Sequence, residues 1–276
     1  MRESSSSTIL VHFLEEYQRL NEKVNNTLRD YLGDPGVVQT RNLRAAVRRL
    51  DTAIRVLPKK TRSEKAVKRC HERCKELLEV TSRVRDLDIL EDRISKHPRD
   101  ATVTLLLNNL HEEREEFVSN STKAAWKLFE HHPPSLVKGD LPRLAGRIED
   151  VVEDLDAEIV SELQAVLKDP AKVDELHSLR KHCKRLRYTL ELFPSMGHYS
   201  RLVILLRKWQ DLLGEIRDSD VITDYLSRAK PTEAVRTMLA SERAFRQRRY
   251  AAFVQSCKRG SQDGEYSLLG PRPPLR

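Results

Sequence analysis

One segment shows the helical pattern of this chain most clearly: Leu176-His177-Ser178-Leu179-Arg180-Lys181-His182-Cys183-Lys184-Arg185-Leu186-Arg187-Tyr188-Thr189-Leu190-Glu191-Leu192-Phe193. On a helical wheel, at about 100° per residue, its apolar side chains fall within one arc of about 100°. They are Leu176, Leu179, Cys183, Leu186, Leu190 and Phe193. The other side is basic and carries His177, Lys181, Lys184 and Tyr188, with Arg180, Arg185 and Arg187 at its edges. The segment therefore predicts an amphipathic helix with one buried stripe.

An earlier segment, residues 41–57, has the same geometry. Its apolar stripe is Leu43, Val47, Leu50, Ile54 and Leu57, and its far side carries Arg41, Arg44, Arg48 and Arg55, flanked by Arg49. The segment Val84-Arg85-Asp86-Leu87-Asp88 likewise matches Ile216-Arg217-Asp218-Ser219-Asp220. Because residue type, order and approximate spacing recur, we predict a duplicated helical unit with pseudo-two-fold symmetry.

Helical periodicity covers almost the whole chain, without strand-like alternation. We predict helices over residues 8–32, 38–57, 61–84, a shorter one ending before 97, 101–130, 141–168, 171–193, 199–214, 216–229 and 232–258. Thr61 and Glu64 suit a capping box, and Asp86 and Asp218 suit caps at helix junctions. The fold class is therefore all-α, with one domain over residues 8–259 and halves at 8–132 and 138–259. We expect flexible termini at 1–7 and 260–276.

Composition excludes several classes of protein. The 276 residues are 39% hydrophobic and 33% charged, which suits a core beneath a heavily charged surface. With 5% aromatic residues, stacking platforms for single-stranded nucleic acid are disfavoured. No apolar run approaches the roughly 18 residues of a membrane span, and the start lacks the apolar core of a signal peptide. We expect a cytoplasmic protein that is not embedded in a membrane.

Cysteine and tryptophan fit buried positions. Cys70 and Cys74 flank His71, but a second pair of zinc ligands at fitting spacing is missing, so we expect buried thiols and no metal site. We also expect Trp126 and Trp209 to lie in the core.

The two basic faces are unusual because each is nearly of one sign. No acidic residue occurs in 41–49 or 177–188, although like charges at i,i+4 repel by a few tenths of a kcal/mol. Acidic residues of neighbouring helices, such as Glu72, Glu79 or Asp211, are one source of compensation. An external polyanion is the other, and the net charge of +8 and the recurrence in both halves favour it.

The helices that follow add more cations on their far sides. If these helices pack beside the two basic ones, the added cations face a shared groove, and two such grooves form one channel. The added cations are Lys68, Lys75, Arg201, Arg207 and Lys208.

Together these motifs resemble the CHAD domain, the conserved histidine α-helical domain. The 177–188 segment is similar to its signature H-x-x-R-x-x-x-K-R-L-R-Y, and residues 213–218 are similar to its L-G-x-x-R-D. The resemblance covers about residues 8–259 and implies two four-helix bundles around a central basic channel that binds inorganic polyphosphate. The first copy departs from the pattern, with Arg41 in place of His177 and Asp51 in place of Arg187. Asp51 either weakens the local positive field or tethers Arg55.

The resemblance and the basic faces define a candidate polyphosphate site without catalytic or metal-binding residues. Its expected members are Arg41, Arg44, Arg48, Arg49, Lys68, Lys75, His177, Arg180, Lys184, Arg185, Arg187, Arg201, Arg207 and Lys208. The leading contacts are Arg44, Arg48, Arg180 and Lys184. Whether Arg85 and Arg217 touch the ligand or only brace the fold stays open.

Motifs for catalysis are absent. The sequence has no Walker-type loop, no His-Glu-x-x-His and no nucleophile elbow, and it lacks the Glu-x-Glu-x-Lys motif of the CYTH domains often joined to this family. We therefore predict a stand-alone binding module that is not an enzyme, needs no cofactor, and is cytoplasmic, with polyphosphate granules as one location to examine. Nucleic-acid binding by the same basic face is the alternative, and a phosphate-transferring enzyme is the third hypothesis.

Overall fold

The computed structural model describes residues 2–131, 133–193 and 199–260, and no strand occurs among these residues. The elements are α1 (Arg2–Gly33), α2 (Val37–Val56), α3 (Lys59–Ser63), α4 (Lys65–Ile94), α5 (Ala101–Glu130), the 3₁₀ turn η1 (Lys138–Asp140), α6 (Leu144–Val166), α7 (Val173–Glu191), α8 (Ser200–Ser227) and α9 (Glu233–Gly260). The all-α fold class is confirmed for this part of the chain. Of the expected flexible terminus 260–276, Gly260 is the last residue of α9, and residues 261–276 lie outside the described residues, as do His132 and Pro194.

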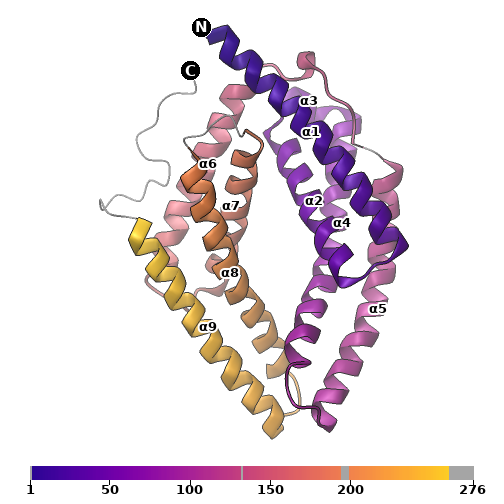
Figure 1. Cartoon of the computed structure of the whole chain (residues 1–276), viewed down its shortest axis with the longest axis vertical. Coiled ribbons are helices and arrows are strands. Elements are labelled where there is room, and N and C mark those ends of the chain that lie inside the picture. Colours follow the sequence, from indigo (N-terminus) through magenta and orange to yellow (C-terminus); the bar gives the residue numbers. More distant parts are fainter. Residues whose placement is uncertain (1, 132, 194–198, 261–276) are drawn as a thin grey trace.

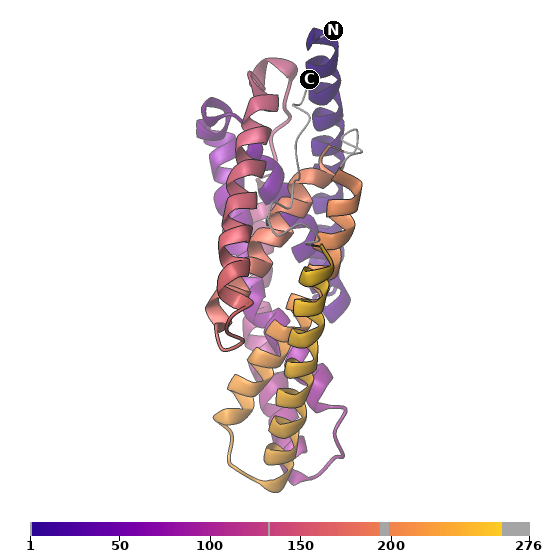
Figure 2. The ribbon, with the colours of Figure 1, turned by 90° about the vertical axis from the view of Figure 1, so that its left-hand side faces the viewer.

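The long helices pack in two sets that run along an elongated molecule (Figures 1 and 2). Helices α1, α2, α4 and α5 pack on one another, and α6 and α9 pack on either side of the α7–α8 pair. The sets meet chiefly where α2 packs on α7 and α4 packs on α8. The basic faces of α2 and α7 therefore come from different sets but lie at the same seam.

Two hydrophobic clusters hold the sets together, and each draws on both. In the larger cluster, the rings of Phe13 and Phe193 stack with their centroids 5.9 Å apart. In the smaller cluster, Leu90 of α4 is buried together with Ile222 of α8. The apolar stripes predicted for α2 and α7 are fully buried in the larger cluster. Burial of these stripes fixes the rotation of each helix about its axis, and so the direction of its basic face.

Two predicted helix breaks are wrong. The 61–84 segment is divided at Glu64, where the short helix α3 ends, and from Lys65 it continues into the shorter predicted helix as α4. The 199–214 and 216–229 segments form the single helix α8. Asp86 and Asp218 therefore lie inside helices and cap nothing. The capping box is wrong as well, because Glu64 precedes α4 without a side-chain cap and the Thr61 hydroxyl donates to the Asp140 carbonyl.

Among the remaining structural expectations, some are confirmed and others are wrong. Helix α1 begins at Arg2, six residues before the predicted start at residue 8. Trp209 is buried and its Nε1 donates to Ser256 Oγ at 3.2 Å, whereas Trp126 is 48% exposed and does not belong to the core. All four cysteines are free and buried. No helix in the described ranges has both the length and the apolar character needed to cross a bilayer.

Candidate functional site

Two adjoining cavities lie at the seam between α2, α4 and α7, and α8 closes the larger one. Their volumes are about 510 Å³ and 450 Å³. The two share much of their lining, which shows that they adjoin. The shared residues are Arg44, Arg48, Ser82, His177, Arg180, Lys184 and Tyr188.

The four leading predicted contacts come together in these cavities. Arg44 and Arg48 are one turn apart on α2, and Arg180 and Lys184 are one turn apart on α7, so each pair projects from one side of its helix. All four line both cavities. The buried stripes turn both pairs toward the seam, which brings cations from two distant parts of the chain into one space.

The structure divides the predicted site into two groups. The predicted site residues that line at least one cavity are Arg41, Arg44, Arg48, His177, Arg180, Lys184 and Arg185. Those that line neither are Arg49, Lys68, Lys75, Arg187, Arg201, Arg207 and Lys208.

Three of the residues that line neither cavity lie within ion-pair distance of Glu191. Arg187 is buried, and its Nη1 donates to Glu191 Oε1 at 2.6 Å while its Nε donates to Gln210 Oε1 at 2.9 Å. Arg207 Nη2 lies 3.4 Å from Glu191 Oε1, and Arg49 Nε lies 3.9 Å from its Oε2. One carboxylate therefore faces three arginines, and Arg187 is a structural brace.

The remaining cations face solvent. Lys68, Lys75, Arg201 and Lys208 are exposed, and Lys68 Nζ lies 4.0 Å from Glu72 Oε1. The helical wheel placed these side chains correctly away from the core. It did not reveal that helix packing turns that side outward instead of toward the shared cavities.

Burial penalises the positive charges that line the cavities. Burial, and then the nearby Arg180 and Arg48, lower the pKa of Lys184 to about 6. Burial and the same Arg180 lower the pKa of His177 to about 4. Burial and Arg48 lower the pKa of Arg44 to about 9. An anion in the cavities would offset both the lost hydration and the mutual repulsion of these groups.

Several nitrogen atoms of this cluster lack partners. Arg44 Nε, Arg180 Nε and His177 Nδ1 are buried and have no hydrogen-bond partner among the described residues. Arg44 is nonetheless anchored, because its Nη1 donates to the Leu78 carbonyl at 2.8 Å and to Thr81 Oγ1 at 2.5 Å. Arg44 therefore joins α2 to α4 as well as lining the cavities.

The Arg-Asp motifs form part of the lining of the larger cavity. From the sequence alone, it was an open question whether their arginines touch the ligand. Arg85 and Arg217 both line it, together with Asp86 and Asp218. Arg217 Nη2 lies 3.6 Å from Asp86 Oδ2, so this arginine braces α8 on α4 while it borders the cavity. Burial raises the pKa of Asp218, against the effect of the surrounding arginines. The repetition of Arg-Asp in both halves was the available signal for this part of the site.

Acidic residues supply part of the compensation for the basic faces. Asp211 and Glu215 line the larger cavity, and Asp51 and Glu79 line the smaller one. Asp51 Oδ2 accepts from Arg55 Nε at 2.7 Å, which confirms the tether considered from the sequence. In both cavities the cationic side chains outnumber the carboxylates. The lining is therefore suited to an anion with many charges.

The described residues contain no group of three or more His, Cys, Asp or Glu side chains arranged to hold a metal ion. Cys70 and Cys74, considered as a zinc half-site, lie in the hydrophobic core. The hydrogen bond with the Cys70 thiol, and then burial, raise the pKa of Cys74.

Comparison with known proteins gives two kinds of match. Residues 17–227 match the family model described as the CHAD domain. Among solved structures, the crystal structure of the CHAD domain from the plant Ricinus communis is similar, with a TM-score of 0.64, 16% identity and 91% of each chain covered. PptA from Streptomyces chartreusis has a TM-score of 0.49 and 17% identity, with 90% of this chain and 99% of that chain covered. No curated protein matches the chain.

Proposed function

Since the chain belongs to the CHAD domain family, we propose that it binds inorganic polyphosphate in the two adjoining cavities, which together form one basic channel. The observation that carries the proposal is the convergence of Arg44 and Arg48 with Arg180 and Lys184. The similar packing of α2 and α4 in one set and of α7 and α8 in the other supports the further proposal that the halves arose by duplication.

The chemistry of the lining suits a linear phosphate polymer. Such a polymer carries roughly one negative charge per phosphate and offers only oxygen acceptors. Arginine can donate to two phosphate oxygens at once, whereas lysine acts as a point charge. Arg48 and Arg180 therefore fix neighbouring phosphates, while Lys184 and His177 gain stability in their charged forms when an anion arrives.

The site favours polyphosphate over nucleic acid. The cavities lie between helices at the seam, whereas a duplex is bound on an open surface that follows its backbone and grooves. Single strands are usually bound with aromatic side chains that stack on bases. Among the described lining residues, Tyr188 is the only Phe, Tyr or Trp. A narrow polyanion without bases fits this lining better than a nucleic acid does.

A competition experiment tests the proposal. The protein is titrated with long-chain polyphosphate and with duplex DNA over a series of salt concentrations, because phosphate contacts weaken as salt rises. We expect polyphosphate to stay bound at salt concentrations that release the duplex. The reverse order would support nucleic-acid binding instead. Release of orthophosphate from polyphosphate in the presence of Mg²⁺ would contradict the non-catalytic part of the proposal.

A further inference from the structure

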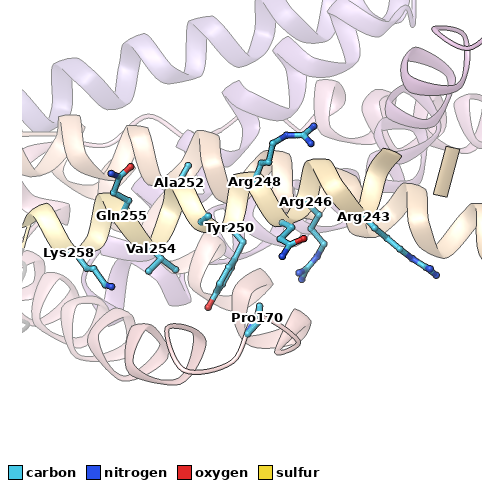
Figure 3. A pocket seen from close by; sticks show the side chains of 11 residues that line it. Pro170, Arg243, Arg246, Arg248, Tyr250, Ala252, Val254, Gln255 and Lys258 are labelled. Carbon is cyan, nitrogen blue, oxygen red and sulfur yellow. The ribbon is translucent and has the colours of Figure 1, made fainter. Parts of the chain in front are cut away.

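Helix α9 leaves a groove open along the edge of the molecule. It packs chiefly on α8, and the Tyr250 hydroxyl donates to the Val166 carbonyl at the end of α6 at 2.6 Å. A groove of about 1030 Å³ follows α9 beside Pro170, in the connection between α6 and α7 (Figure 3). None of its described lining residues belongs to the basic cavities. The groove is therefore a separate feature of the surface.

The groove combines apolar surface with charges of one sign. The apolar part is supplied by Pro170, Tyr250, Ala251, Ala252 and Val254. The charged lining residues that the structure describes are Arg243, Arg246, Arg248 and Lys258, all basic. Figure 3 shows Tyr250 and Val254 projecting from α9 toward the side on which Pro170 lies. A ligand for this groove needs both negative charge and apolar surface.

The charge of α9 is only partly compensated within the protein. From Arg243 to Lys258 the sequence contains no acidic residue. Arg246 pairs with Asp220 of α8. Arg243 and Arg248 are exposed, and no carboxylate of the described residues lies within ion-pair distance of either. These two arginines are therefore available to an acidic partner.

We propose that this groove binds an acidic amphipathic helix of a partner protein. Its apolar side chains would cover Ala251 and Val254, and its carboxylates would face Arg243 and Arg248. Between Arg243 and Lys258 the axis of α9 rises about 23 Å, at about 1.5 Å per residue, which matches a partner helix of about four turns. Polyphosphate has no apolar group to place on the floor, and a bilayer surface is not shaped to enter a groove.

Fluorescence anisotropy with a designed peptide tests the proposal. The probe is a labelled helix of about 16 residues with leucines on one face and glutamates on the other, and its control is a shuffled peptide of equal composition. We expect the patterned peptide to bind at least about tenfold more tightly than the shuffled one, because only the former presents a continuous apolar face. Equal binding of the two peptides, or no binding of the patterned peptide, would overturn the proposal.

Variants locate the binding. The double variant Arg243→Glu/Arg248→Glu should weaken the patterned peptide about tenfold, because it replaces attraction by repulsion at two exposed positions. The exposed pair Lys65→Glu/Lys123→Glu, which has the same change in net charge, should leave the affinity unchanged. If Arg48→Glu/Lys184→Glu abolishes peptide binding instead, the peptide occupies the basic cavities and the groove proposal is wrong.

Other anions are excluded in parallel. Polyphosphate and vesicles of phosphatidylglycerol are titrated against the Arg243→Glu/Arg248→Glu variant and the parent protein. We expect both titrations to be the same for the two proteins. A selective loss of vesicle or polyphosphate binding in the variant would reassign the groove to that anion and overturn the proposal.

Discussion

Arg217 Nη2 of α8 lies 3.6 Å from Asp86 Oδ2 of α4, and this pair joins the two helix sets at the wall of the larger cavity. The residues come from the two copies of the Arg-Asp motif, so each copy supplies one partner. Asp86 therefore has opposite effects on the stability of the seam and on the affinity of the cavity for an anion. It stabilises the seam, and it reduces the positive potential that an anionic ligand meets.

Asp86→Asn should separate these two effects. Loss of the ion pair should lower the free energy of unfolding by about 1 kcal/mol, since both side chains are partly exposed to solvent. Polyphosphate affinity should rise several-fold, because the cavity loses one negative charge. Thermal unfolding and a binding titration measure the two effects. Asp92→Asn, at an exposed pair with Lys96, is the control and should leave affinity unchanged. Weaker binding by Asp86→Asn would show that Arg217 must be held in place to bind the ligand.

Binding should become tighter as the pH falls from 8 to 6. Burial holds the pKa of Lys184 near 6 in the free protein, and bound phosphates favour the charged ammonium, so binding takes up protons in this range. Isothermal titration in buffers of different ionisation enthalpy measures this uptake. Lys184→Arg should bind with little pH dependence, because arginine stays charged throughout. Equal proton uptake by the parent protein and Lys184→Arg would assign the pH dependence to another group.

The same lysine should destabilise the ligand-free protein. Its pKa is about 6 in the folded state and 10.5 in the unfolded chain, so the unfolded state binds more protons between these values. The contribution of Lys184 to stability is therefore most unfavourable below about pH 6 and improves as the pH rises toward 10.5. Lys184→Met should raise the Tm at pH 7 while it weakens polyphosphate binding. A lower Tm would mean that the ammonium makes stabilising contacts in the free protein.

Arg187→Met should reduce stability without affecting the ligand. The side chain is buried and donates to Glu191 and Gln210, so its loss should cost about 2 kcal/mol of unfolding free energy. Polyphosphate affinity should stay within about twofold of the parent value, because Arg187 lines neither cavity. Arg48→Met should show the opposite pattern, with weaker binding and a smaller change in stability. A large loss of affinity in Arg187→Met would restore this residue to the binding site.

The sequence predicted the fold well where periodicity alone decides the outcome. The stripes containing Leu43 and Leu179 identified the buried faces of α2 and α7, and thereby the basic faces opposite them. The breaks expected near Asp86 and Asp218 were wrong because aspartate inside a helix and aspartate at a cap look alike in sequence. In the structure Asp86 faces Arg217 of another helix, and such long-range pairing leaves no local signal.

The residues at the centre of the site could be predicted from the sequence, but the roles of several outer residues could not. Arg48 and Arg180 follow from the one-sign helix faces, because each lies opposite a buried stripe. Arg207 and Lys208 also lie opposite buried residues, but a helical wheel does not show whether that side meets another helix or solvent. The role of Glu191 was hidden for the same reason, since it accepts from Arg187 of its own helix and lies near Arg49 of another.

A polyphosphate titration of the triple variant Arg48→Glu/Arg180→Glu/Lys184→Glu tests whether the ligand binds between the helix sets. Arg44 is left unchanged because it joins α2 to α4. The control is Lys68→Glu/Arg201→Glu/Lys208→Glu, which makes the same change in net charge at exposed positions. We predict that the cavity variant loses about a hundredfold in affinity, from three contacts of about 1 kcal/mol each, while the control loses about threefold or less. Equal losses in the two folded variants, or unchanged affinity in the cavity variant, would contradict polyphosphate binding between the helix sets.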